Sequence, residues 1–158
     1  MKIIVIGPSL SGKTTIIRLI RETTNLVVSE IDEELTRLNN NQYPTDNDYK
    51  HKILTPTVIN NVLNMPQVIF FTNTDYFTIP NLQLARAKGF KIIQLKLSLQ
   101  DLEKRNAFRV KNEGYSDLSE WLSGMLKYQS DVENSGLFDK TIDASKPTIE
   151  IVDEILKT

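Results

Sequence analysis

Short apolar runs alternate with amphipathic segments along all 158 residues of the chain. The apolar runs predict five β-strands, near residues 2–6, 26–30, 67–72, 90–97 and 138–142. The amphipathic segments predict helices near residues 13–24, 32–40, 49–63, 80–88, 99–112, 117–134 and 147–157. The run at 68–71 is apolar on both faces, which is typical of a central strand covered on each side. The alternation therefore predicts a three-layer α/β/α fold with a parallel sheet between helices.

Size and composition indicate one globular domain that spans residues 1–158. A hydrophobic share of 40% and a charged share of 25% are ordinary for such a domain. The polar stretch at 39–48 is rich in turn-forming residues, so it predicts a surface loop and not a domain boundary. A net charge of −1 gives no overall field that would attract nucleic acid or anionic lipid, although a local basic patch remains open.

The chain contains no cysteine, which excludes disulfides and thiolate metal sites. The first apolar run is too short before Gly7 to be a signal or membrane segment, so no membrane partner is expected. Cytoplasm is the default compartment on this basis. We expect either a monomer or a homodimer.

One segment carries a phosphate-binding pattern, G-x-x-x-x-G-K-[ST], at residues 7–14. It lies between the first predicted strand and the first predicted helix, which is the context that the pattern requires. Gly7 lets the chain leave the strand in a conformation that side chains disfavour, and Gly12 lets the backbone approach phosphate closely. Backbone amides of the loop and of the helix start then point at the anion. The expected nucleotide-binding residues are Gly7, Pro8, Ser9, Leu10, Ser11, Gly12, Lys13, Thr14 and Thr15.

The last residues of this pattern supply the chemistry. Lys13 places a positive charge beside the outer phosphates, and the Thr14 hydroxyl is placed to ligate Mg²⁺ bound to the same phosphates. The alternative is an ordinary glycine-containing turn with an exposed lysine. GTPases need an Asn-Lys-x-Asp motif and an Asp-x-x-Gly switch, and the chain contains neither. Large motor or oligomeric ATPases need a longer core, so the small-molecule kinases remain.

The chain resembles the adenylate-kinase-like P-loop kinases, a superfamily that includes shikimate, gluconate and nucleotide kinases and polynucleotide-kinase-type domains. The resemblance covers essentially the whole chain and rests on four segments: 7–14, the acidic residue after the second strand, 70–73 and 102–109. Arg105-Asn106 with Arg109 is most similar to the Arg-Asn-x-x-Arg stretch of the polynucleotide-kinase-like branch. The resemblance implies parallel strands in the order 2-3-1-4-5, an acceptor-binding region near 32–65 and a short lid near 105–116.

The resemblance also implies a role for Asp32, which follows the second predicted strand. In the related kinases an Asp at this place accepts the proton of the acceptor hydroxyl or holds Mg²⁺, so Asp32 and Thr14 are the expected metal-site residues. Glu30 is a weaker candidate for the same task. The alternative for Asp32 is a helix N-cap, with Glu33 and Glu34 complementing the helix dipole.

Arg105 and Arg109 are four residues apart and so project from one helix face. The resemblance makes them lid arginines that lie over the ATP phosphates and, with Lys13, stabilise the transferred charge. The alternative is a solvated basic face paired with Asp101 and Glu103.

The loop after the last predicted strand contains Ala144, Ser145 and Lys146. In the resembling kinases this loop passes beside the adenine ring, and ATP is favoured over GTP on that ground alone; an ordinary strand-to-helix connection is the alternative. Many relatives carry an Asp at the end of the third strand, where this chain has Thr72 and Asn73. The second carboxylate of the Mg²⁺ site therefore stays open, with Asp75 as one candidate.

The predicted function is transfer of the γ-phosphoryl group of ATP to a small acceptor, such as a nucleoside, a nucleotide or a related metabolite. The region at 32–65 has no diagnostic motif for that acceptor. A phosphate or carboxylate on it has four candidate ligands, each of which is also explained as a solvated residue: Arg37, Lys50, Lys52 and Arg86. His51 lies in a polar stretch and is expected at the surface.

Two other functions remain open at this point. A kinase acting on 5′-hydroxyl ends of nucleic acid is favoured by Arg105-Asn106 and opposed by the near-neutral net charge. A non-catalytic nucleotide-binding module is favoured by the missing strand-end Asp.

Overall fold

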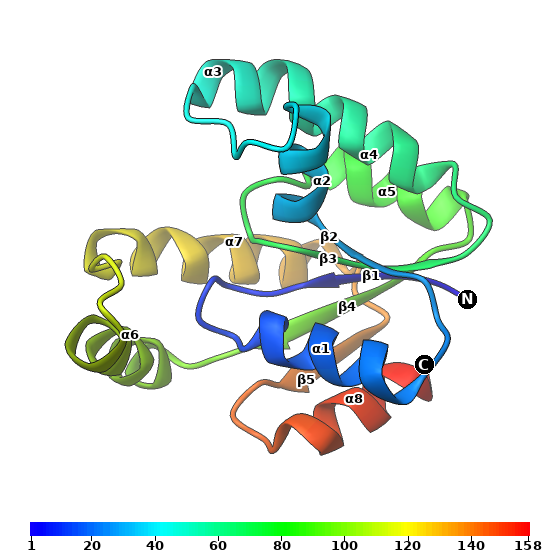
Figure 1. Ribbon diagram of the computed structural model, residues 1–158. Coiled ribbons are helices and arrows are strands. Elements are labelled where there is room, and N and C mark those ends of the chain that lie inside the picture. Colours follow the sequence, from blue (N-terminus) through cyan, green and yellow to red (C-terminus); the bar gives the residue numbers. More distant parts are fainter.

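The computed structural model describes residues 1–158, and its centre is a five-stranded parallel sheet in the order β2-β3-β1-β4-β5 (Figure 1). The central strand β1 pairs with β3, where Lys2 lies beside Val68 and Ile6 beside Thr72. On its other side β1 pairs with β4, where Ile3 lies beside Lys91. Both the sheet and the strand order expected from the resemblance are confirmed. The strands are β1 (Lys2–Ile6), β2 (Val28–Glu30), β3 (Val68–Thr72), β4 (Lys91–Lys96) and β5 (Lys140–Asp143).

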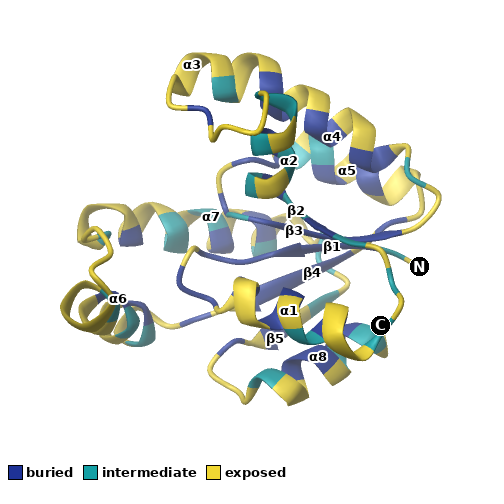
Figure 2. Cartoon of the chain, viewed as in Figure 1, coloured by how far each residue is buried: buried dark blue, intermediate teal, exposed yellow.

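Helices cover both faces of this sheet, as the alternation predicts. Because successive strand residues point to opposite faces, Ile3 and Val5 pack in one hydrophobic cluster and Ile4 and Ile6 in another. The first cluster includes α1 (Lys13–Thr23) and α8 (Thr148–Leu156). The second includes α2 (Ile31–Leu38), α4 (Thr55–Leu63) and α5 (Ile79–Ala87). Figure 2 shows the helices buried toward the sheet and exposed on their outer sides.

The helix predicted at 49–63 contains a local departure from α-helical geometry. It is built from α3 (Asn47–Tyr49), a π-helical turn η1 (Lys50–Leu54) and α4. Thr55, just before Pro56, is itself helical, and its N–H bonds to the carbonyl of Lys50, five residues back. Its hydroxyl donates to the same carbonyl at 2.8 Å. The wider turn accommodates a proline that has no N–H to donate.

Two long helices follow β4 and frame the site. The first, α6 (Leu99–Glu113), begins at Ser98, whose side chain accepts from the Asp101 N–H, and ends at Gly114 with φ 68°. The stretch predicted as one helix over 117–134 begins as a 3-10 turn, η2 (Ser119–Trp121), and continues as α7 (Leu122–Ser135). No helix of the protein is long and apolar enough to cross a membrane.

The carboxyl ends of the strands meet at one edge of the sheet, which is where open α/β sheets bind their ligands. The phosphate loop leaves β1 there, Asp32 lies two residues beyond β2, and Asn73 directly follows β3. The fold thus brings the residues singled out by sequence to one edge.

Candidate functional site

The loop between β1 and α1 has a backbone that two glycines make possible. A Cβ on Gly7 would lie 2.5 Å from Ser11 Oγ, and the Gly7 N–H donates to the Thr72 carbonyl at 3.1 Å. Gly12 has φ 81°, a conformation that residues with side chains rarely adopt. Both glycines are therefore required at their positions, but for different reasons. Gly12 is required by its conformation, whereas Gly7 lacks the unusual conformation expected of it and is required because a Cβ would collide with Ser11.

The Lys13 side chain bonds back to the backbone of this loop. Its buried ammonium donates to the carbonyls of Gly7 at 2.9 Å and Pro8 at 2.8 Å. Burial lowers the pKa of Lys13 to about 8, although the nearby carboxylates of Glu30 and Asp32 act in the opposite direction. The charged group is thus held in place without an anionic partner in contact, and a phosphate would offer it a stronger one.

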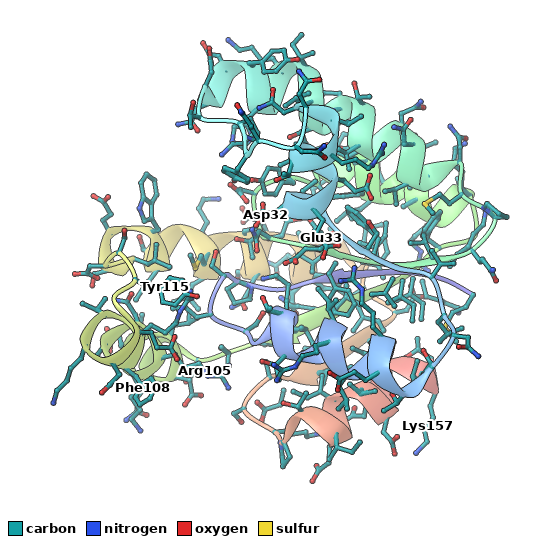
Figure 3. The ribbon with its side chains drawn as sticks, in the orientation of Figure 1. Asp32, Glu33, Arg105, Phe108, Tyr115 and Lys157 are labelled. Carbon is teal, nitrogen blue, oxygen red and sulfur yellow. The ribbon has the colours of Figure 1, made fainter.

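A cavity of about 970 Å³ opens in front of the loop. It is lined by the phosphate loop, by the ends of β2 and β3, and by one face of α6 with the segment that follows. Figure 3 shows Asp32 on one side of the loop and Arg105, Phe108 and Tyr115 on the side formed by α6 and its continuation. The lining residues are Ser9, Leu10, Gly12, Lys13, Thr14, Thr15, Glu30, Asp32, Asn73, Lys104, Arg105, Asn106, Phe108, Arg109, Glu113, Tyr115, Ser116 and Leu118.

Asp32 lines this cavity and has one carboxylate oxygen without a hydrogen-bond partner. It is the second residue of α2, and the N-cap position is occupied by Glu30, so the alternative role of Asp32 as the N-cap is wrong. Its Oδ1 is buried and has no hydrogen-bond partner. Burial raises the pKa of Asp32, and the charges of Lys13 and Lys50 act against that rise. Burial likewise raises the pKa of Glu30, and the Asp32 carboxylate adds to that effect.

These groups fit a bound Mg²⁺. The ion prefers oxygen ligands and is usually held by one or two carboxylates together with phosphates and water. Thr14 is exposed at the start of α1, and both Thr14 and the Asp32 carboxylate line the same cavity. No group of three or more acidic, histidine or cysteine side chains is placed to hold a metal alone. The metal would therefore depend on the nucleotide phosphates for most of its ligands.

Arg105 joins the phosphate loop to the loop that follows β5. Its Nη1 donates to the Leu10 carbonyl at 2.8 Å, and its Nη2 donates to the Ala144 carbonyl at 2.7 Å. Both terminal nitrogens are thus used by backbone oxygens in this conformation.

Asn106 anchors the chain beyond the lid. This side chain, 6% exposed, donates to Asp117 Oδ1 at 2.7 Å and Ser119 Oγ at 3.2 Å and accepts from the Leu118 N–H at 2.9 Å. Hydrogen bonds from Ser119 and Asn106 lower the pKa of Asp117 to about 2. The arrangement ties 117–119 to α6 across the segment that we expect to act as a lid.

Arg109, in the last turns of α6, contacts Tyr115 and Glu113. Its guanidinium lies 4.0 Å from the centre of the Tyr115 ring, a cation–π contact, and its Nε is 3.9 Å from Glu113 Oε2. These are weak, solvent-accessible contacts, so Arg109 can leave them for a phosphate at little cost.

Neither a protein-family model nor a curated protein sequence matches this chain, but solved structures match its fold. A shikimate kinase from Aquifex aeolicus has a TM-score of 0.73 at 19% identity, covering 99% of this chain and 95% of its own. A shikimate kinase from Acinetobacter baumannii, in complex with shikimate, has a TM-score of 0.72 at 17% identity, covering 99% and 90%. A gluconokinase from Sinorhizobium meliloti has a TM-score of 0.62 at 18% identity, covering 99% and 89%. The chain has the fold of the P-loop small-molecule kinases.

Within this fold, the predicted site residues fall into three groups, of which the loop after β5 is the last. Those that line the cavity are Ser9, Leu10, Gly12, Lys13, Thr14, Thr15, Asp32, Arg105 and Arg109. Gly7, Pro8 and Ser11 support the loop from behind, since the first two supply the carbonyls that Lys13 contacts and Ser11 Oγ donates to Pro8.

The loop expected beside the adenine does not line this cavity. Ala144 contributes its carbonyl to Arg105, Ser145 bonds to the Asp143 carboxylate, and Lys146 pairs with Glu154 at 2.6 Å. Adenine contact by this loop therefore stays a prediction.

Sequence reasoning did not identify the aromatic residues of the site. Phe108 and Tyr115 line the cavity, and Phe108 shares a helix face with Arg105, three residues earlier, so its spacing was an available signal. Tyr43 and Tyr76 act electrostatically on Asp32 and on each other, yet they come from separate loops, and no local pattern points to them.

Proposed function

We propose that this protein is an ATP-dependent kinase that transfers the γ-phosphoryl group to a hydroxyl of a small acceptor. The observation that carries the proposal is that Lys13 and Asp32, a carboxylate with one oxygen that has no hydrogen-bond partner, line one cavity of about 970 Å³. The Lys13 ammonium can bind a phosphate, and the Asp32 carboxylate can accept the proton of an alcohol. The matched structures support it, because they include kinases, one of them bound to shikimate.

In the proposed reaction, the triphosphate lies against the loop amides, and Lys13 exchanges its two carbonyl partners for phosphate oxygens. The acceptor oxygen forms a new bond to the γ-phosphorus while the bond from that phosphorus to the β–γ bridging oxygen breaks. ADP leaves, and the hydroxyl proton passes to Asp32 or to a water that Asp32 holds. Bound Mg²⁺, held by Thr14 and the phosphates, would neutralise part of the phosphate charge.

Lid movement would complete the site. Arg109 would leave Glu113 and Tyr115 and meet the transferred group, where an arginine that stabilises the spread charge is worth about 10³–10⁵ in rate. Exclusion of water by the closed lid would favour transfer over hydrolysis. Arg105 keeps its hold on the loop in this scheme, so its expected part is to position the phosphates.

The two other functions differ in their support. Asn106, which carried the likeness to polynucleotide kinases, is buried and bonded within the fold, so it is not free to contact a nucleic-acid end. The non-catalytic module keeps one observation in its favour: Asn73, an amide, lines the cavity where many relatives have a carboxylate.

The test is an acceptor screen with radiolabelled ATP and Mg²⁺ across nucleosides, nucleotides, sugars, sugar acids and 5′-hydroxyl oligonucleotides. We expect label on at least one small acceptor and ATP binding by calorimetry. Tight ATP binding without transfer in single-turnover reactions would favour the non-catalytic module. The absence of any ATP uptake by the folded protein would contradict the proposal altogether.

A further inference from the structure

The loop that follows β5, expected beside the base of the nucleotide, has no free backbone N–H group to offer it. The Ala144 N–H donates to a carbonyl of β4 at 2.9 Å, and the Ser145 N–H donates to Asp143 Oδ1 at 2.8 Å. The Lys146 N–H donates to the Asp143 carbonyl at 3.4 Å, and Pro147 has no N–H. Purine rings present acceptors on their edges, N7 in both bases and O6 in guanine. This loop therefore has no backbone donor with which to tell one purine from the other.

Two aromatic rings are the exposed apolar groups of the cavity lining. Phe108 is 58% exposed and Tyr115 is 55% exposed, whereas Leu10 is buried and Leu118 is half-buried. The Tyr115 ring is already covered by the Arg109 guanidinium, 4.0 Å from its centre. Phe108 takes part in no aromatic stack and in no cation–π contact. Phe108 is thus the ring of the cavity that is open to a ligand.

The position of Phe108 suits the end of the nucleotide that lies furthest from the acceptor. In the proposed reaction the γ-phosphate meets the acceptor beside Asp32, so the base lies toward the other end of the cavity. Figure 3 shows Phe108 beside Arg105, on the far side of Tyr115 from Asp32. Arg105, about one turn earlier on α6, is bonded to the phosphate loop. A triphosphate on that loop would therefore carry its base along α6 to Phe108.

From these observations we propose that the base of the nucleotide stacks on Phe108 and is not selected by its edge, so that the site takes ATP and GTP alike. The proposal rests on the function proposed above, but only on its nucleotide side. Stacking on an aromatic side chain tolerates different bases, because every base has a π-face. Phe108 is then a binding residue for the phosphoryl donor, and either purine triphosphate can serve as that donor.

The direct test measures the Kd of three Mg²⁺ complexes by calorimetry: ATP, GTP and inorganic tripolyphosphate. Tripolyphosphate offers a chain of phosphates without a base, so its affinity reports on the phosphate loop alone. For the wild-type protein we expect the Kd values of ATP and GTP to lie within about fivefold of each other, because stacking is tolerant of the base. A larger difference between the two purine triphosphates would overturn the proposed tolerance.

Variants at two aromatic positions locate the effect. Phe108→Leu keeps an apolar side chain without a ring, so it should weaken the binding of ATP and GTP by about fivefold or more and that of tripolyphosphate by less than about twofold. Phe108→Tyr keeps a ring and should bind both nucleotides as the wild-type protein does. The matched control is Trp121→Leu, which removes a ring that is 60% exposed and does not line the cavity. It should change none of the three Kd values, and thermal melting verifies that the variants fold.

The outcomes separate this inference from the proposed function. Equal effects of Phe108→Leu and Trp121→Leu would overturn the base contact, and so would a loss of tripolyphosphate affinity that matches the loss for ATP. Both results would leave the kinase function standing. If both triphosphates bind as expected and no acceptor is phosphorylated, the proposed function fails and the base contact stands. The absence of uptake of either triphosphate would overturn both.

Discussion

The two sides of the cavity are built in opposite ways. On the proposed nucleotide side the two basic groups that hold the loop have backbone partners: Lys13 bonds to two carbonyls, and Arg105 to two more. On the proposed acceptor side, Asp32 keeps one buried oxygen without a partner. The first side uses backbone groups fixed by a local turn, whereas the second uses side chains from separated segments. We infer that one side is preformed and that the other is completed by its ligand.

The largest effect is expected on the preformed side. Lys13→Ala should lower kcat by at least two to three orders of magnitude, because it removes the charge that meets the transferred group. The matched control is Lys127→Ala, a surface lysine paired with Asp131, which should leave turnover unchanged. Turnover with the successful acceptor of the screen is the measurement, and thermal melting verifies that both variants fold. Near-wild-type activity of Lys13→Ala would contradict the assignment of the loop.

The next effect probes the carboxylate of the acceptor side. Asp32→Asn keeps the size of the side chain but cannot accept the hydroxyl proton, so kcat should fall by about 10²-fold or more. ATP binding, measured by calorimetry without acceptor, should change little. Asp131→Asn, at an exposed surface pair, serves as the control. If Asp32→Asn instead weakened ATP–Mg²⁺ binding and kcat in proportion, its part would be that of a metal-site residue.

The pKa of Lys13 predicts how ATP affinity depends on pH. With that pKa lowered to about 8 in the free protein, ATP binding above pH 8 requires proton uptake, because phosphate favours the charged form. The Kd should be flat below pH 8 and then rise about tenfold per pH unit. Since the unfolded chain binds more protons between about pH 8 and 10.5, the free protein should also gain stability across that window. Calorimetry in buffers of different ionisation enthalpy checks the proton uptake, and a flat Kd to pH 9.5 would contradict it.

The smallest expected effect concerns the anchor of the lid. Asn106→Ala leaves Asp117, Ser119 and the Leu118 N–H without their shared partner, which should lower Tm by a few degrees. KM for ATP should rise several-fold with kcat nearly unchanged. Asn112→Ala, which loses only an exposed bond to the Phe108 carbonyl, is the matched control. Equal melting temperatures for the two variants would remove the anchor role.

Much of the nucleotide side was predictable because its determinants are local in sequence. The strands follow from apolar runs to within two residues at their ends. The loop geometry depends on Gly7, which has no room for a side chain, and on Gly12, whose positive φ disfavours one. The strand order came from the resemblance alone and is confirmed. The lid anchor was not foreseen, since Asn106 and Asp117 are eleven residues apart and meet only after α6 turns back.

The acceptor side was beyond prediction for a physical reason. Tyr43 and Lys50 act on the pKa of Asp32, and Asp32 acts on that of Tyr76, only because tertiary packing brings them near, and each is unremarkable in its own stretch of sequence. The π-helical turn was also hidden, because Pro56 reads as the start of a new helix and in fact lies within a continuous one. The pairing of Arg37 with Glu34, by contrast, could be anticipated from their spacing of three residues.

Arg105 holds residue 10 with one nitrogen and residue 144 with another, so a single side chain couples the beginning of the polypeptide to its last strand. A shortened chain that ended before β5 would retain the complete phosphate-binding motif at residues 7–14. It would lose the Ala144 carbonyl, one of the two backbone contacts that hold Arg105 against this motif. Fragments and chimaeras of this protein should therefore retain Arg105 and both of its backbone partners, because the motif alone lacks these contacts.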